Sequence, residues 1–382
     1  MSRLGSPRVL WSAAALGALG VVLTLVVSGP ARFFLNWVLW FVFLVSVGLG
    51  ALFVVALEHL VGSHWSIPLR RVPERIASLL LPAVPVGLVA LLAMPVLYPW
   101  SHAEAAQNPF VAGKLVWLNT GFVGFRTVLF LVLWAGAYVF FCGGSLKQDA
   151  SHDPAFTVKA RRWSPAFMVV FAFSLTILAF DWISSLEPEW YSDIFGVYLF
   201  AGTFLCGLAA TGLAVVALKN RGRLEGVRQD HLYNVGGYIF AFTVFWSYIA
   251  FAQYMLMWYA NMPEEVFWYA DRIHGPWLPV ALLLAAIHFV GPFFLLIARK
   301  AKGELTFMKW VGLMVLAGHF LDLYWLIVPS GKMGILAGWQ EASFALFFLS
   351  GGVLWMRRAM ARGEDMPVGD PFLTEGLAFR MH

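Results

Sequence analysis

The sequence is poor in charge and in cysteine. Asp, Glu, Lys and Arg make up 12% of its 382 residues, about half of the roughly 25% that soluble domains carry. A soluble globule must cover its surface with polar groups, so a soluble fold is excluded. The two cysteines, Cys142 and Cys206, lie in apolar runs, and no C-x-x-C-H motif occurs. A disulfide framework, an iron–sulfur cluster and covalently attached haem c are therefore excluded.

Long apolar runs take the place of the missing charge. A helix needs about 20 apolar residues to cross a hydrocarbon layer of roughly 30 Å, and ten runs are long enough. We predict an all-α integral membrane protein of about ten transmembrane helices, one polytopic domain over 1–382. The spans are 9–27, 33–60, 76–98, 115–142, 164–185, 194–218, 234–260, 276–298, 306–329 and 335–355, and a polar tail covers 358–382. The first run is too long for the apolar region of a signal peptide.

The basic residues are distributed unevenly between the two sides of these spans. Twenty-one of the 26 Lys and Arg fall on the side that holds both termini, four on the other side, and Arg126 inside a span. Short loops rich in Lys and Arg stay in the cytoplasm, so we expect both termini to be cytoplasmic in a multi-pass protein of a bacterial inner membrane. The basic residues lie in loops rather than on one face, which argues against nucleic-acid binding.

Several polar residues fall inside the predicted spans, where an ionisable group costs about 2.5–3.5 kcal/mol on insertion scales. From the helical rise, Arg126 and Asp181 reach overlapping depths and lean toward each other, so we predict a buried ion pair. His319 and Asp322 lie one turn apart on one helix face and could exchange protons. By helical rise, His319, Asp322 and Glu341 lie about 15, 10 and 9 Å below the outer surface, so we expect them to form a descending series that opens to that side. The remaining candidates for a proton route or a quinone-facing cluster are Gln253 and His288, with Glu58 and His59 near the inner side.

Each of these groups also has a structural interpretation. Buried pairs pin helices together, and a lone histidine such as His288 is often a core residue with satisfied hydrogen bonds. His288 and His319 reach similar depths and could ligate a haem, but haem-binding bundles usually carry further paired histidines at that depth. We therefore expect no haem and no metal. Loops of the side opposite the termini are acidic, which is typical of a solvated surface or of a docking face for a basic partner.

Four stretches together resemble one family. They are DWISSLEPEWYSDIFGVYLFAGTF (Asp181–Phe204), FWSYIAFAQYMLMWYANMPEEVFWY (Phe245–Tyr269), FLDLYWLIVP (Phe320–Pro329) and PVGDP (Pro367–Pro371). They are similar to the F subunit of bacterial alternative complex III, a quinol:electron-acceptor oxidoreductase. RRVPE (Arg70–Glu74) and Arg126 agree with the same pattern more weakly.

The resemblance implies a ten-span subunit, related to polysulfide-reductase-like membrane subunits, with two four-helix bundles and flanking helices. It implies that the subunit binds neither haem nor an iron–sulfur cluster. It also implies that the subunit contacts a quinone and that its intramembrane polar residues conduct protons. The implied partners are a related C membrane subunit and, on the outer side, iron–sulfur and haem c subunits. Such a subunit is not catalytic by itself.

Two other functions fit the composition. One is a purely structural scaffold, whose buried charges only hold helices together. The other is a self-contained transporter, for which matching broken helices in inverted repeats are typical. Pro82, Pro85 and Pro95 interrupt one span while Pro292 alone interrupts its counterpart, so the repeat is not matched.

Overall fold

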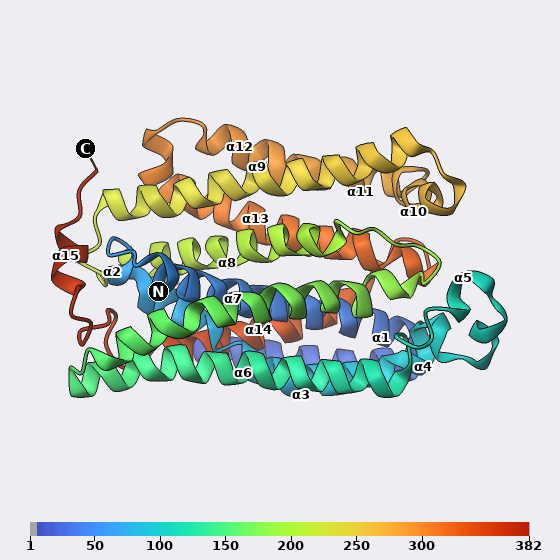
Figure 1. The fold of residues 1–382 in the computed structure, drawn as a ribbon, viewed down its shortest axis with the longest axis horizontal. Coiled ribbons are helices and arrows are strands. Elements are labelled where there is room, and N and C mark those ends of the chain that lie inside the picture. The colour runs from blue at the N-terminus through green and yellow to red at the C-terminus, as the bar shows by residue number, and fades with distance from the viewer. Residues whose placement is uncertain (1–5, 382) are drawn as a thin grey trace.

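The computed structural model describes residues 6–381, and every regular element in that range is helical. Long helices lie side by side along one axis (Figure 1). At one end of the bundle, the α2 end, lie α2 (Ile67–Ala77) and α15 (Leu373–Ala378); at the other, the α10 end, lie α5 (Pro109–Ala112) and α10 (Pro263–Ile273). The predicted all-α class is confirmed. Arg3 and His382 lie outside the described residues.

The first helix is a hairpin of two membrane spans. α1 (Pro7–Val61) has 55 residues, but Gly29 breaks it with φ 80° and ψ 170°. Both arms pack on α14 (Trp339–Met360) in opposite order. In the first arm a Cβ on Gly17 would lie 2.5 Å from the backbone nitrogen of Phe347, and a Cβ on Gly20 would meet Ser343. In the second arm Phe33 contacts Phe344 and Trp40 stacks on Phe348. The chain therefore reverses at Gly29, as the predicted spans 9–27 and 33–60 require.

Within residues 6–381, eight helices are long and apolar enough to cross a membrane. Counting α1 as two spans and adding α14, with its 22 residues, gives ten, in agreement with the prediction. The others are Ile67–Leu97, built from α2, α3 (Leu80–Ala90) and α4 (Met94–Leu97); α6 (Thr120–Ser151); α7 (Ala155–Trp182); α8 (Phe195–Lys219); α9 (Gln229–Ala260); Trp277–Leu296, built from α11 (Trp277–Leu284), the π-helical segment Ala285–Val290 and α12 (Gly291–Leu296); and α13 (Leu305–Ile327).

The centre of the bundle is α8, which packs against α1, α7, α9 and α13. Small residues let the backbones meet: a Cβ on Gly207 would lie 2.3 Å from the carbonyl carbon of Gly50. Close approach at small residues is the usual way in which membrane helices pack, because burial of apolar area gives no driving force in lipid. This contact fixes the second arm of α1 against α8.

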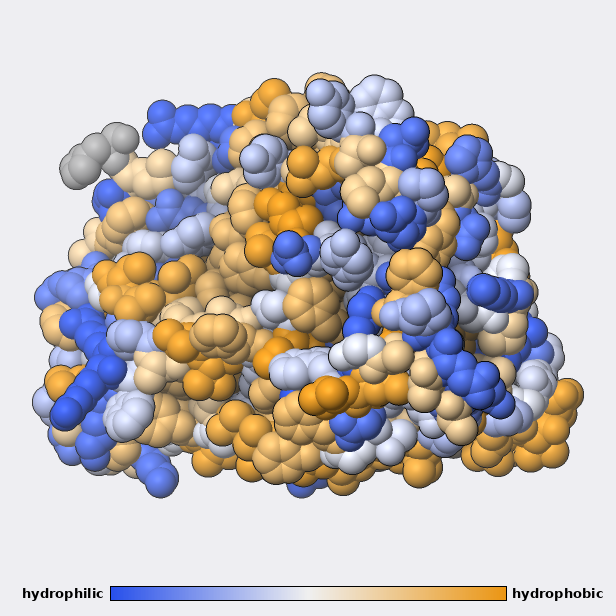
Figure 2. All heavy atoms as spheres, turned by 45° about the vertical axis from the view of Figure 1, so that its right-hand side comes forward, coloured by the Kyte–Doolittle hydropathy of each residue, from blue (hydrophilic) through white to orange (hydrophobic). Residues whose placement is uncertain are grey.

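The outer helices present apolar side chains outward. Phe125 and Val132 of α6, Phe251 of α9 and Phe294 of α12 are all more than half exposed. Figure 2 shows broad apolar areas, interrupted by hydrophilic patches, on the face that it presents. A bundle with apolar faces turned outward is stable where lipid covers them.

The region before the third predicted span differs from expectation. Arg70, Arg71 and Arg75 were expected in a loop, but every residue of α2 is buried. Arg70 pairs with Asp370 of the C-terminal tail, and Arg71 with Glu74 and Asp149. A charge can be buried when it is paired and hydrogen-bonded, so these ion pairs allow α2 to extend the span back to Ile67. The predicted polar tail is accordingly held against α2.

Candidate functional site

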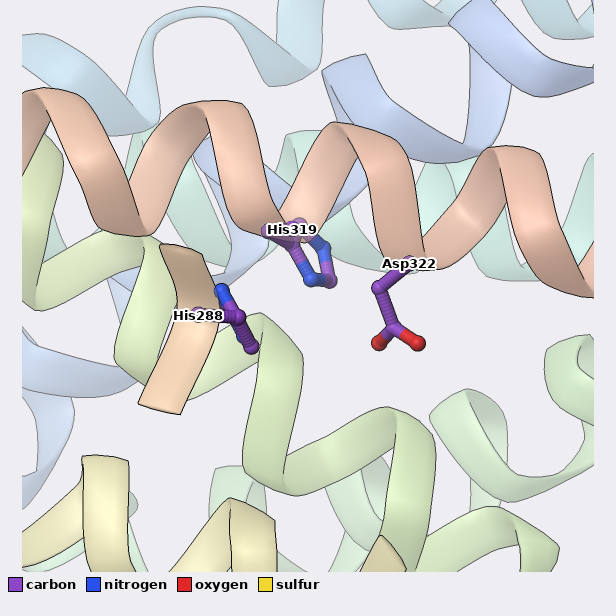
Figure 3. Close-up of side chains that lie close together, drawn as sticks. All are labelled: His288, His319 and Asp322. Carbon is purple, nitrogen blue, oxygen red and sulfur yellow. The ribbon is translucent and has the colours of Figure 1, made fainter. Parts of the chain in front are cut away.

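Three ionisable residues meet in the interior of the bundle. His319 and Asp322 lie one turn apart on α13, and His288 lies on the π-helical segment that faces them (Figure 3). One ligand atom from each residue lies within 4.8 Å of the others, and the exposed fraction of each side chain is 1% or less. We call these residues the His–His–Asp cluster. The sequence paired His319 with Asp322, and the structure adds His288.

Two glycines make room for the imidazole rings. A Cβ on Gly318 would lie 2.4 Å from Nδ1 of His288, and a Cβ on Gly202 would lie 2.8 Å from Nδ1 of His319. Both distances are far below van der Waals contact, so any larger residue would displace a ring. The π-helical segment, a form often found at functional sites, sets the direction of His288.

Asp322 is held by two neutral donors. The Tyr198 hydroxyl donates to Oδ1 at 2.5 Å, and Nε1–H of Trp246 donates to Oδ2 at 3.2 Å. The same Trp246 ring meets the His288 ring edge-on, with centroids 4.3 Å apart. Within residues 6–381, Asp322 forms no ion pair with Lys or Arg. Its carboxyl group is thus oriented by hydrogen bonds and has no fixed countercharge, which suits a group that gains and loses a proton.

The imidazoles lack hydrogen-bond partners. No ring nitrogen of His288 or His319 forms a hydrogen bond of normal geometry within the described residues. An unsatisfied buried polar group costs about 1–3 kcal/mol. These four nitrogens are therefore not engaged by the described part of the protein, and a neutral imidazole keeps one N–H donor and one acceptor nitrogen. Two imidazoles and a carboxylate are also a donor set that Zn²⁺ or Fe²⁺ accepts.

The predicted pair of Arg126 and Asp181 is confirmed. Arg126 on α6 donates from Nε and Nη2 to the two carboxylate oxygens of Asp181 on α7, at 2.9 and 2.8 Å. Its guanidinium also lies 4.1 Å from the ring centroids of Trp117 and Phe122. Both charges are buried and paired, an arrangement that fixes α6 on α7.

The other candidates have separate surroundings. Glu341 accepts two hydrogen bonds from Arg32 and one each from Asn36 and the Gly338 backbone. It therefore joins α14 to the α1 hairpin, whereas the sequence placed it in a series with His319 and Asp322. Gln253 is buried on α9, and its Oε1 accepts no hydrogen bond from any residue in 6–381.

Glu58 and His59 end the second arm of α1 and are both buried. His59 lines a cavity of about 410 Å³ together with Arg70, Phe141 and Gln148. Glu58 Oε2 has no hydrogen-bond partner in the described part of the chain. Glu58 lines a separate cavity of about 30 Å³, so the two inner-side candidates do not share one open space, although Arg70 of α2 borders both cavities.

Sequence reasoning missed Tyr198 and Trp246. Both lie within the quoted stretches, but an aromatic residue in an apolar span is usually packing. The sequence does show that both residues lie well inside predicted spans. A buried tyrosine hydroxyl or tryptophan N–H usually needs a hydrogen-bond partner, and this could have indicated their role.

No family model matches this chain, and no curated protein matches it in sequence, so the assignment of the site depends on residues and geometry.

Proposed function

We propose that this chain is a cofactor-free membrane subunit of a quinol-oxidising electron-transport complex, similar to the F subunit of alternative complex III, and that the His–His–Asp cluster carries protons. The observation that carries this proposal is the buried carboxyl group of Asp322, which forms no ion pair within residues 6–381, beside four imidazole nitrogens that form no hydrogen bond in the same part of the chain. Oxidation of a quinol releases protons, and a His next to a carboxyl group can accept them and pass them on.

The positions of the resembling stretches support this role. Tyr198, Trp246 and Asp322 come from three different stretches, yet they form one hydrogen-bonded unit. Arg70 of RRVPE and Asp370 of PVGDP, likewise far apart in the chain, form an ion pair. Residues from different resembling stretches therefore contact each other. This is expected if one group forms the cluster and the other holds the surrounding helices in place.

We propose that the α2 end faces the cytoplasm of a bacterial cell, because it collects the basic residues. The α10 end then faces outward and exposes Glu104, Asp193, Glu264 and Asp271. An acidic surface suits the docking of basic or electron-carrying subunits. In this arrangement the subunit is not catalytic alone, and it contacts the quinone of the complex.

Proton stoichiometry tests the role of the cluster. In the assembled complex, Asp322→Asn and His319→Phe should lower the number of protons released per electron while assembly persists. Thr24→Val is the matched control, because Thr24 is a buried polar residue of α1 outside the cluster, bonded to the Gly20 carbonyl. Normal turnover and normal stoichiometry in both cluster variants would favour the scaffold function instead.

A metal centre is the second candidate for the same residues, because the three ligand atoms converge. A metal ion would compete with Tyr198 and Trp246 for the carboxylate oxygens of Asp322. We therefore expect elemental analysis of the purified protein to find no stoichiometric zinc or iron. If the wild type contained one metal ion per chain and His319→Phe contained none, the cluster would be a metal site rather than a proton relay.

A further inference from the structure

A cavity of about 260 Å³ opens at the α2 end between α2, α6 and the C-terminal part of α14. It is distinct from the His–His–Asp cluster and does not depend on the function proposed above. Small-molecule pockets have volumes of about 300–1,000 Å³, so the cavity is of a size for a small polar group. Its wall combines four arginines with aromatic and aliphatic side chains, among them Arg71, Arg75, Arg358, Arg362, Trp355 and Tyr138.

The four arginines differ in their partners. Arg71 and Arg75 are buried and neutralised by acids, Arg71 by Glu74 and Asp149 and Arg75 by Asp365. Arg358 and Arg362, one helical turn apart, are exposed, and their guanidinium groups form no ion pair within residues 6–381. Glu74 is the acid on the cavity wall, and it is already shared by Arg70 and Arg71. The mouth of the cavity therefore carries uncompensated positive charge.

The other side of the cavity is apolar and aromatic. Leu81 and Leu146 on its wall are 36% and 44% exposed. Trp355 donates its Nε1–H to the carbonyl and the hydroxyl of Ser78, which fixes the ring at the edge of the cavity. Tryptophan and tyrosine concentrate at the level of lipid head groups, and basic pockets between membrane helices bind anionic head groups on the cytoplasmic side.

We infer that this cavity binds the phosphate of an anionic phospholipid. Arg358 and Arg362 contact the phosphate, while the acyl chains lie against Leu81 and Leu146. A free anion would use the charges alone; the exposed leucines beside them favour an amphiphile. Bound phosphate also offsets the repulsion between these two arginines. The backbone of Arg362 already accepts a hydrogen bond from Arg75, so a lipid here would strengthen the contact of the tail with α2.

Thermal stability of the purified protein with added lipid tests the site. We expect phosphatidylglycerol to raise the Tm of the wild type by several degrees more than phosphatidylcholine does. The double variant Arg358→Gln/Arg362→Gln should lose this difference. The control Arg162→Gln/Arg221→Gln removes the same charge from exposed arginines of the α2 end outside the cavity and should keep it. Inorganic phosphate at the same concentration should have no effect.

Native mass spectrometry provides a second readout that does not depend on stability. The wild type and the control should retain phosphatidylglycerol, and the cavity variant should retain at least tenfold less. Arg358→Lys/Arg362→Lys should restore part of the retention. Equal loss in both Gln variants would mean diffuse attraction rather than a site, and an equal Tm shift with inorganic phosphate would mean that a free anion is the ligand. Either result overturns the inference.

Discussion

Arg70 of α2 and Asp370 of the C-terminal tail are joined by a buried ion pair of 2.5 Å, although 300 residues separate them in the chain. Arg70 also lies 3.4 Å from Glu74, and Thr157 donates to the same Asp370 oxygen at 3.4 Å. The tail is therefore part of the packed structure. It reaches α2 and α7 with side chains that the apolar spans do not provide.

Asp370→Asn should destabilise the protein by about 3 kcal/mol. Removing one partner of a buried pair leaves the other charge uncompensated, at a typical cost of about 3–5 kcal/mol, and Glu74 offsets part of this for Arg70. The measurement is denaturant or thermal unfolding in detergent. Glu375→Gln is the control, because Glu375 lies on the same tail and pairs with His64, but its side chain is 61% exposed. If Asp370→Asn and Glu375→Gln lowered the free energy of unfolding equally, burial of the ion pair would not explain its contribution to stability.

The pair of Arg126 and Asp181 should behave as one unit in a double-mutant cycle. Arg126→Leu or Asp181→Leu alone should cost about 3–5 kcal/mol, because each leaves a buried charge. The double variant should be milder than either single one. Additive losses in unfolding experiments would show that the two charges are not coupled.

Alanine at Gly202 or Gly318 should disturb the His–His–Asp cluster. The added methyl groups would meet the rings of His319 and His288, and overpacking of this kind typically costs about 1–3 kcal/mol. Gly237→Ala on α9 is the control, since a Cβ there has open space, and its helix should be unchanged or more stable. If all three variants had wild-type stability and proton stoichiometry, the glycines would not position the rings.

The tail should also give the protein an acid-sensitive stability. Burial raises the pKa of Asp365, but hydrogen bonds from Arg223 and Arg75 outweigh it and hold that pKa below its ordinary value. The stabilisation is therefore complete above the ordinary pKa of about 3.9 and is lost as pH falls through the lower pKa of the folded state. The free energies of unfolding of the wild type and Asp365→Asn should differ most at pH 6, and the difference should shrink as the pH falls below about 3.9. A constant difference across that range would contradict this assignment.

Topology is open to a direct test. Reporters fused after the C-terminus should behave as cytoplasmic, and a reporter inserted at Lys332 as external, because the α2 end holds most of the basic residues. An external C-terminus would reverse the orientation that we propose for both faces.

The membrane spans and one buried ion pair, that of Arg126 and Asp181, could be predicted from the sequence. Hydropathy located the ten helices, and helical rise placed Arg126 and Asp181 at compatible depths. Rise along a helix is one coordinate, however, and rotation about its axis depends on packing. That is why Glu341 could be placed at the depth of Asp322 although it faces Arg32 on the α1 hairpin.

Burial of charge was the other limit of sequence reasoning. Arg70, Arg71 and Arg75 appear as a basic loop because hydropathy scores each residue alone, whereas their burial depends on acids from α6 and the tail. The hydrogen bonds of Asp322 depend in the same way on Tyr198 and Trp246 from other helices. Such partners are set by tertiary structure, and a single sequence does not reveal them.

The hairpin at Gly29 has a consequence for biosynthesis. The first arm of α1 leaves the ribosome long before α14, yet its tightest contacts, at Gly17 and Gly20, are with Phe347 and Ser343 of that helix. Contacts between distant parts of a chain form late. The N-terminal arm therefore remains exposed to lipid or to insertion factors during most of synthesis, and a chain that stops before α14 leaves it without its packing partner.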